Sequence, residues 1–119
     1  MTAVSPDRIA LTFPRAEAYR GVASLVLGGL AGRTDMPYER TDDLQLAVLS
    51  ALEATEGESV TIEIHLSETA LDVSLGPLAP GAREDRALLN VIGKLVDGAE
   101  GSSRDGREWL TLSLSRPSG

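Results

Sequence analysis

Few residues of this 119-residue chain could carry out chemistry, and their spacing does not suit it. The single histidine, His65, would need a serine and a carboxylate beside it to act as the base of a Ser-His-Asp triad. It lies instead on the polar face of an expected strand, VTIEIHL, and we interpret it as a solvated strand residue. Asp42 and Asp43 are adjacent on an expected helix, where consecutive residues diverge, so they share no site. We interpret them as charges that favour the start of that helix.

Common binding motifs are missing as well. The chain has no GxxxxGK[ST] phosphate loop, and the stretch GPLAPG at 76–81 does not match GxGxxG. No cluster of His, Asp and Glu has the spacing of metal ligands, and a cysteine count of 0 excludes thiolate sites and disulfides. The sequence therefore predicts no metal site.

Composition limits the class of protein and the class of partner. Hydrophobic residues at 42% and charged residues at 24% are typical of a globular protein, and the length fits one domain over 1–119. No apolar run approaches the roughly 18 residues of a membrane span, and the start MTAVSPDR lacks the pattern of a secretory signal. We therefore expect a cytoplasmic protein. The net charge of −7 argues against nucleic acid and anionic membranes as partners and permits a basic protein.

The periodicity of apolar residues predicts the elements that must position any site. Period-two alternation predicts strands at 8–13, 60–66, 71–75 and 107–116, with a hairpin at 60–75. Helical spacing predicts helices at 15–31, 38–55 and 84–98, the first beginning at Pro14, and the polar stretch EGSSRDG at 100–106 reads as a turn. The order is β-α-α-β-β-α-β. The buried stripe of the second helix is expected to be Leu44, Val48, Ala51, Leu52 and Thr55.

Each expected strand has one apolar and one polar face, so helices should cover only one face of the sheet. The predicted fold class is α/β (α+β), a two-layer sandwich with a mixed, mostly antiparallel sheet. Trp109 alternates with the inward leucines of the last strand and should lie on the open face, where an exposed tryptophan indicates a contact surface.

This order of elements, together with DLQLAV at 43–48, resembles the GHKL ATPase superfamily, and within it the bacterial anti-sigma factors of the serine-kinase type. The stretch LVDGAE at 95–100, followed after a turn by GREWLTL at 106–112, is similar to the closing segment of those proteins too. The resemblance implies a single histidine-kinase-like ATPase domain with a Bergerat-like fold. It also implies a sigma factor or a STAS-type anti-anti-sigma factor as partner, and ATP with Mg²⁺ as cofactors.

The family's chemical groups are replaced in this chain. In the family, a Glu on the second helix polarises the attacking hydroxyl, and an Asn four residues later helps to hold Mg²⁺. Aligned on DLQLAV, these positions are Ser50 and Ala54. Alanine cannot bind a metal, and serine is a poor general base at neutral pH. Glu53 projects about 60° away from Ser50 on a helix, so it is a weak substitute.

Two glycine motifs of the family are also altered. The D-x-G-x-G motif, whose Asp binds the adenine amino group, corresponds to 74–78, where Ser74 replaces the acid, Gly76 survives and Leu78 fills a place of close backbone approach. The G-x-G-L motif, whose amides meet the phosphates, corresponds to Arg86-Ala87-Leu88-Leu89, without glycine.

The resemblance thus predicts a pseudo-ATPase, a non-catalytic module that binds other proteins and needs no cofactor. Its degenerate nucleotide-site positions would be Ser50, Ala54, Ser74, Gly76, Leu78, Arg86 and Leu88. Two alternatives stay open: an active ATP- and Mg-dependent serine/threonine kinase with divergent motifs, and a structural subunit that forms a homodimer or docks on another enzyme. A plainer interpretation also stays open, in which Ser50 and Ala54 are small only so that a neighbouring helix or the 77–82 loop packs closer.

Overall fold

The computed structural model of the chain describes residues 2–5, 8–17, 21 and 36–116. Six strands form one sheet in the order β1-β2-β3-β4-β6-β5, and every neighbouring pair is antiparallel. The strands are β1 (Thr2–Ser5), β2 (Arg8–Pro14), β3 (Ser59–Leu66), β4 (Ala70–Leu78), β5 (Gly98–Arg104) and β6 (Arg107–Ser115). The helices are α2 (Tyr38–Leu52), the 3-10 helix η1 (Ala82–Glu84) and α3 (Arg86–Leu95). In these described parts, no helix is long and apolar enough to cross a membrane.

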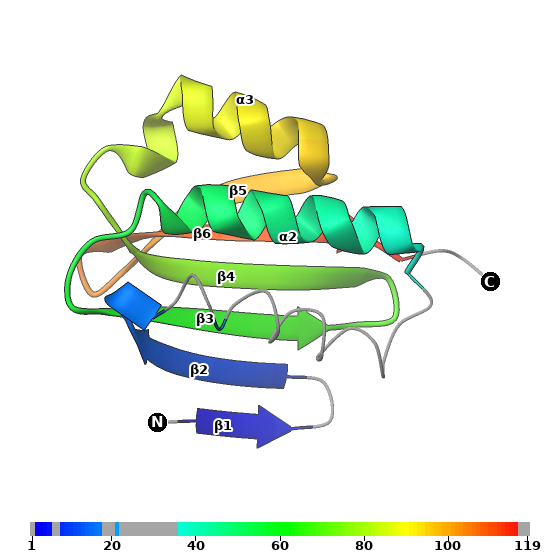
Figure 1. Ribbon diagram of the computed structural model, residues 1–119, viewed down its shortest axis with the longest axis horizontal. Helices are drawn as coiled ribbons and strands as arrows, with labels where there is room; N and C mark the ends of the chain where they lie inside the picture. Colours follow the sequence, from blue (N-terminus) through cyan, green and yellow to red (C-terminus); the bar gives the residue numbers. More distant parts are fainter. Residues whose placement is uncertain (1, 6–7, 18–20, 22–35, 117–119) are drawn as a thin grey trace.

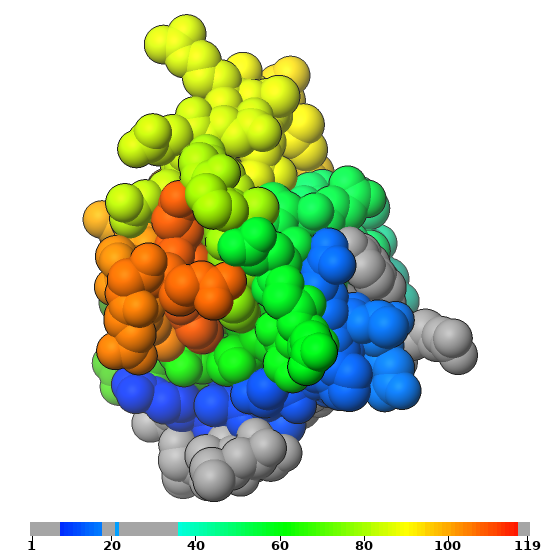
Figure 2. Space-filling view, turned by 90° about the vertical axis from the view of Figure 1, so that its left-hand side faces the viewer, coloured from blue at the N-terminus to red at the C-terminus, as the bar shows by residue number. Residues whose placement is uncertain are grey.

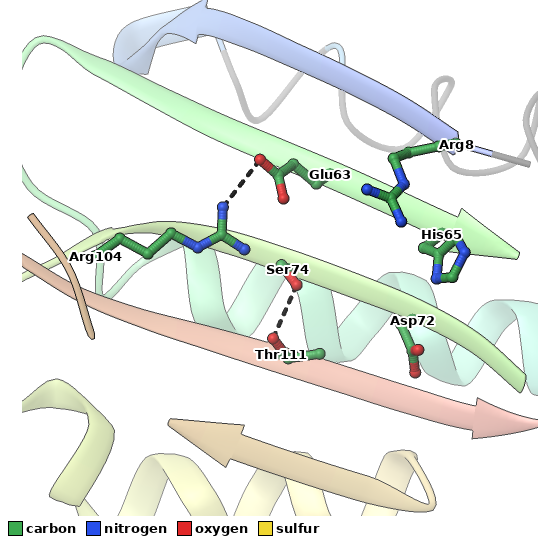
Figure 3. Close-up of a pocket in the computed structure, with 7 residues that line it drawn as sticks. All are labelled: Arg8, Glu63, His65, Asp72, Ser74, Arg104 and Thr111. Atoms are coloured by element: carbon green, nitrogen blue, oxygen red, sulfur yellow. Dashed lines mark hydrogen bonds and ion pairs between the residues drawn. The ribbon is translucent and has the colours of Figure 1, made fainter. Parts of the chain in front are cut away.

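The sheet and the helices form two layers, as the sequence predicts. Helices α2 and α3 lie on the same face of the sheet (Figure 1). The opposite face, which we call the open face, has no described helix on it, as the close-up in Figure 3 shows with α2 behind the strands. The prediction of a two-layer α+β fold is confirmed. The sheet was expected to be mixed, but all of its described strand pairs are antiparallel.

The predicted inward residues form the core between these layers. The alternation places the β-branched and leucine side chains of β3, β4 and β6 on the core side of the sheet, where α2 contacts β4 and β6, because successive strand residues point to opposite faces. Core residues at most 5% exposed include Val60, Ile62, Ile64, Leu71, Val73, Leu75, Leu110, Leu112 and Leu114 from the sheet, and Leu44, Ala47, Val48, Ala51 and Leu52 from α2.

Several boundaries differ from the prediction. The expected turn at 100–106 is mostly strand β5, which pairs with β6 through a tight turn in which Asp105 and Gly106 both have positive φ. Helix α3 accordingly ends at Leu95, not at residue 98. Strand β4 runs on to Leu78 through residues expected to be loop, and the N-terminal strand β1 was not predicted. Pro14 is the last residue of β2 and not the start of a helix.

Other expectations hold in part. Helix α2 ends at Leu52, three residues early, yet Thr55 is buried as predicted, because it forms a β-bridge with Leu78. Of the helix predicted at 15–31, residues 15–17 and 21 are helical, and the remainder lies outside the described residues.

Candidate functional site

The end of α2 carries the two positions where the family resemblance places catalytic and metal-binding groups. Ser50 is half-buried, and its hydroxyl donates a hydrogen bond to the carbonyl of Leu46 one turn earlier (3.0 Å). Ala54 lies just past the helix and packs against the core. Neither side chain presents a free carboxylate or amide, so this stretch has no general base or metal ligand at those positions.

The chain that follows β4 is tied directly to the end of α2. The N–H of Ala79 donates to the carbonyl of Ala54 (2.7 Å), and the N–H of Glu56 donates to that of Pro77 (3.1 Å). Leu78, between these bonds, is only 1% exposed. The 77–79 segment therefore packs against Ala54, which supports the interpretation that a small residue is needed there for close approach.

The next segment, η1, is held to the sheet by Glu108 of β6. The Glu108 carboxylate accepts hydrogen bonds from the N–H groups of Gly81 (2.7 Å) and Arg83 (3.1 Å). Because these two donors stabilise the charged form, the pKa of Glu108 lies below its ordinary value. The Arg83 guanidinium lies 3.7 Å from the same carboxylate, and its side chain covers Gly101 of β5. Arg83 thus bridges elements of its own chain.

The start of α3 is already occupied by a negative charge of the protein. Asp85 is the N-cap of α3, and its carboxylate accepts hydrogen bonds from the N–H groups of Ala87 (2.9 Å) and Leu88 (3.2 Å). These are the amides that would meet a phosphate in the family. Arg86 beside them is exposed, whereas Leu88 is half-buried against the core.

The seven sequence-predicted site positions are not gathered in one place. Five of them lie on the helical side of the sheet or in the core, namely Ser50, Ala54, Leu78, Arg86 and Leu88. The hydroxyl of Ser74, by contrast, lies on the open face and shares a hydrogen bond with that of Thr111 (2.8 Å; Figure 3). Gly76 lies under the ring of Trp109 on the same face. The sheet therefore separates two of the seven positions from the rest.

The open face carries a network of side chains that cross between strands. The register lines up Arg8, His65, Asp72 and Ser113 in one row across β2, β3, β4 and β6. In that row, the Ser113 hydroxyl donates to Asp72 (2.6 Å). His65, interpreted from the sequence as solvated, is half-buried between Arg8 and Asp72 in a shallow hollow of about 230 Å³ (Figure 3).

The predicted open-face position of Trp109 is confirmed. The side chain of Arg104 starts on β5, stacks on the Trp109 ring with its guanidinium carbon 4.1 Å from the ring centre, and ends at Glu63 of β3 (2.9 Å). Arg104 and Glu63 line both the 230 Å³ hollow and a second hollow of about 390 Å³ that reaches Trp109 and Pro77. The two hollows share Arg104 and Glu63, and we refer to them together as the groove of the open face.

One end of this groove is fixed by an ion pair between distant segments. Arg107, at the start of β6, lies 3.2 Å from the Glu56 carboxylate in the loop after α2. Figure 2 shows this end of the molecule, with the orange β5–β6 turn beside the green segment that follows α2. The two guanidinium groups of Arg104 and Arg107 thus have acidic partners within the chain.

Asp85, Glu108 and Arg104 are among the residues of this region that sequence reasoning missed. Asp85 could have been found, because an aspartate immediately before a helix is a typical N-cap signal. Glu108 and Arg104 gave no signal, since Gly81 lies 27 residues from Glu108 and Glu63 lies 41 residues from Arg104. Over residues 2–5, 8–17, 21 and 36–116, no three His, Asp or Glu side chains are grouped so that they could hold a metal ion.

Comparison with known proteins gives one informative match. The chain is 35% identical over 75 residues to the serine-protein kinase RsbW of Listeria innocua, a stretch covering 56% of this chain and 48% of the kinase. The chain therefore spans about half the length of the relative it matches. No protein-family model matches the chain. The match supports the resemblance to anti-sigma kinases that the sequence indicates.

Proposed function

We propose that this protein is a regulatory module, similar to an anti-sigma factor, that acts by binding other proteins and has lost the Mg-ATP chemistry of its relatives. The observation that carries the proposal is the Asp85 carboxylate bound to the first amides of α3. A helix N-terminus binds phosphate through free N–H groups and a positive dipole end. Here an internal carboxylate uses two of those donors and would repel a phosphate.

The end of α2 supports the same conclusion. The Ser50 hydroxyl is engaged with its own helix, and the methyl group of Ala54 cannot bind Mg²⁺. A fold does not guarantee the chemistry of its relatives, so these local replacements weigh more than the overall likeness.

A module of this kind would act by competing affinities. We propose a sigma factor or a STAS-type anti-anti-sigma factor as partner, on the strength of the similarity to RsbW and the net charge of −7, which suits a basic protein surface. Without hydrolysis, exchange between partners would follow their concentrations and affinities.

Calorimetric titration with Mg-ATP and Mg-ADP tests the loss of nucleotide binding. We expect no heat of binding at nucleotide concentrations up to about 1 mM, which corresponds to a free energy weaker than about −4 kcal/mol. A parallel assay with labelled ATP and candidate partner proteins, with the Listeria kinase as positive control, should show no phosphotransfer. A micromolar dissociation constant, or phosphate on a partner serine, would instead establish the alternative of a divergent kinase.

The homodimer remains a separate prediction. The groove and the stacked Trp109–Arg104 pair make the open face a natural surface for a second copy or another enzyme, since Trp and Arg are enriched at the centres of interfaces. Sedimentation equilibrium of the purified chain measures whether a dimer forms.

A further inference from the structure

The outer side of α2 exposes apolar side chains that the fold itself leaves uncovered. Three large hydrophobic residues are exposed in the part of the chain that the structure describes, and two of them, Tyr38 (78%) and Leu46 (53%), lie on α2. Leu46 lies in the middle of the helix and leaves more than half of its surface outside the core. That apolar surface is available for contact with another molecule.

Helical geometry aligns Leu46 with acidic residues in one narrow strip. At 100° per residue, Glu39, Asp42, Leu46 and Glu53 fall within a sector of about 60°. All four are exposed, whereas Leu44, Ala47, Val48 and Ala51 on the other side are buried, so this strip faces away from the sheet. We call these four residues the outer strip of α2. It is about 21 Å long, which is about four helical turns.

The last charge of this strip does not serve the stability of the isolated helix, whereas the helix dipole favours Glu39 and Asp42 near its start. Glu53 is the C-cap residue, where the negative end of the helix dipole disfavours a carboxylate. Glu39 and Asp42 are like charges three residues apart and repel each other weakly. The one basic residue of α2, Arg40, projects to another side and pairs with Asp97 at 2.7 Å.

The composition of the outer strip selects its partner. An apolar centre between carboxylates is complementary to a helix that carries leucine-like side chains flanked by Lys or Arg, the pattern by which amphipathic helices dock on other helices. The net charge of −7 would speed the approach of such a segment. A second copy of this chain is excluded from this strip, because the same carboxylates would face each other.

We propose that the outer strip of α2 is the docking site for a basic amphipathic helix of a partner protein. This inference rests on the proposed function, because it assigns the surface that a protein-binding regulator would use. It also separates the partner surface from the open face, which lies on the other side of the sheet (Figure 1).

A synthetic helical peptide of Leu and Lys, with leucines at helical spacing, tests the proposal on the full chain. A peptide of the same pattern with Glu in place of Lys serves as the charge control. Binding is measured by fluorescence anisotropy of the labelled peptide, and its location by amide chemical shifts of the ¹⁵N-labelled protein. We expect the Leu-Lys peptide to bind, to shift the amides of α2, and to weaken with salt, while the Leu-Glu peptide does not bind.

Matched variants distinguish a docking strip from general attraction to an acidic protein. Leu46→Glu and Asp42→Lys should each weaken binding about tenfold, as loss of a central contact or an interfacial charge does. Glu100→Lys makes the same charge change as Asp42→Lys at an exposed position that lies opposite Thr111 on the open face, and should change affinity less than about twofold. All three positions are on the surface, and equal melting temperatures would show that the variants remain folded.

The proposal is overturned if the peptide fails to bind, if Glu100→Lys weakens binding as much as Asp42→Lys, or if the shifted amides lie on the open face. None of these results would bear on nucleotide binding. Conversely, micromolar binding of Mg-ATP would contradict the proposed loss of ATP chemistry. It would not change the conclusion about where on the protein the peptide binds.

Discussion

Replacing Gly76 with alanine tests whether the open face is as tightly assembled as its geometry indicates. A Cβ atom at Gly76 would lie 2.6 Å from Cδ2 of Trp109 and 2.8 Å from its Cγ and Cε2. Carbon atoms in contact normally stay about 3.5–4.0 Å apart, so the ring would have to move by about 1 Å. Arg104 stacks on that ring and is bonded to Glu63. Movement of the ring therefore disturbs a network that spans four strands.

The expected loss of stability follows from these contacts. Overpacking by one methyl group costs about 1–3 kcal/mol, and loss of the exposed cation–π contact adds about 0.5–1 kcal/mol. Alanine restricts the unfolded chain more than glycine, which returns about 0.4–1 kcal/mol. The net expectation is a destabilisation of about 0.5–3.6 kcal/mol, centred near about 2 kcal/mol. For a chain of this length, 1 kcal/mol corresponds to about 4 °C, so the melting temperature should fall by about 2–14 °C, with about 8 °C as the central value.

Thermal unfolding followed by circular dichroism measures this shift, and the fluorescence of Trp109, the single tryptophan, reports on its surroundings. Displacement of the ring should move its emission toward that of a more exposed indole. Gly93→Ala is the matched control, because Gly93 is an exposed residue within α3 with no atom near its added Cβ. That change should stabilise the protein by about 0.5–1 kcal/mol through helix propensity.

A double-mutant cycle with Trp109→Ala decides the cause. With the ring removed, the methyl group at Gly76 has space, so Gly76→Ala should become neutral or slightly stabilising, with a coupling energy of at least about 1 kcal/mol. An equal cost of Gly76→Ala with and without the ring would show that the backbone, and not the Trp109 contact, requires glycine. A melting temperature unchanged by Gly76→Ala would refute the close packing itself.

Two further predictions concern charged groups of the helical side. Asp85→Ala should destabilise the protein by about 1 kcal/mol through loss of the α3 N-cap, whereas Asp85→Asn should keep most of the stability. Urea denaturation measures both changes. Equal losses of stability in the two variants would contradict the capping role. The pKa of Glu108 is lowered by the N–H groups of Gly81 and Arg83, and that of Asp97 by the N–H of Ser115 and by Arg40. A carboxylate with a lowered pKa stabilises the folded state above its ordinary pKa, 4.5 for Glu108 and 3.8 for Asp97, and this contribution is lost as the pH falls through the lowered value. As the pH is lowered below about 4.5, the melting temperature should therefore decrease less steeply in the double variant Asp97→Asn, Glu108→Gln than in the parent chain. Equal slopes in the two proteins would show that these hydrogen bonds do not contribute to stability.

Local patterns were sufficient for the elements that bury an apolar face. Strands β3, β4 and β6 and helix α2 have strong periodicity, and their inward residues were predicted correctly because burial on one side imposes that pattern. Strand β5 has no such pattern, since GAEGSSR is polar or small throughout and most of its residues are exposed. It is a strand because β6 supplies hydrogen-bonding partners, and only its Asp-Gly turn gave a local hint.

The positions aligned to the family's motifs do not all lie on one side of the sheet, for a geometric reason. Alignment to motifs gives the position of a residue along the chain, but not the face of the sheet to which its side chain points. Ser74, Gly76 and Leu78 would share one face of a regular strand. The register shift between Leu75 and Leu78 instead places Leu78 in the core, while Ser74 and Gly76 stay on the open face. The predicted position of Trp109 on the open face is confirmed, because it followed from alternation within one strand, although the ring is half-buried there.

By itself, the sequence of this protein determined which side of each strong element is buried, since that depends only on the period of its apolar residues. It also determined that carboxylate and amide groups are missing at Ser50 and Ala54, since that depends on residue type alone. The tertiary structure decided that Glu108 binds the amides of Gly81 and Arg83, that Arg104 reaches Glu63 across Trp109, and that the outer strip of α2 is left uncovered. These features join residues far apart in the chain or depend on what packs against what, and no local pattern records either.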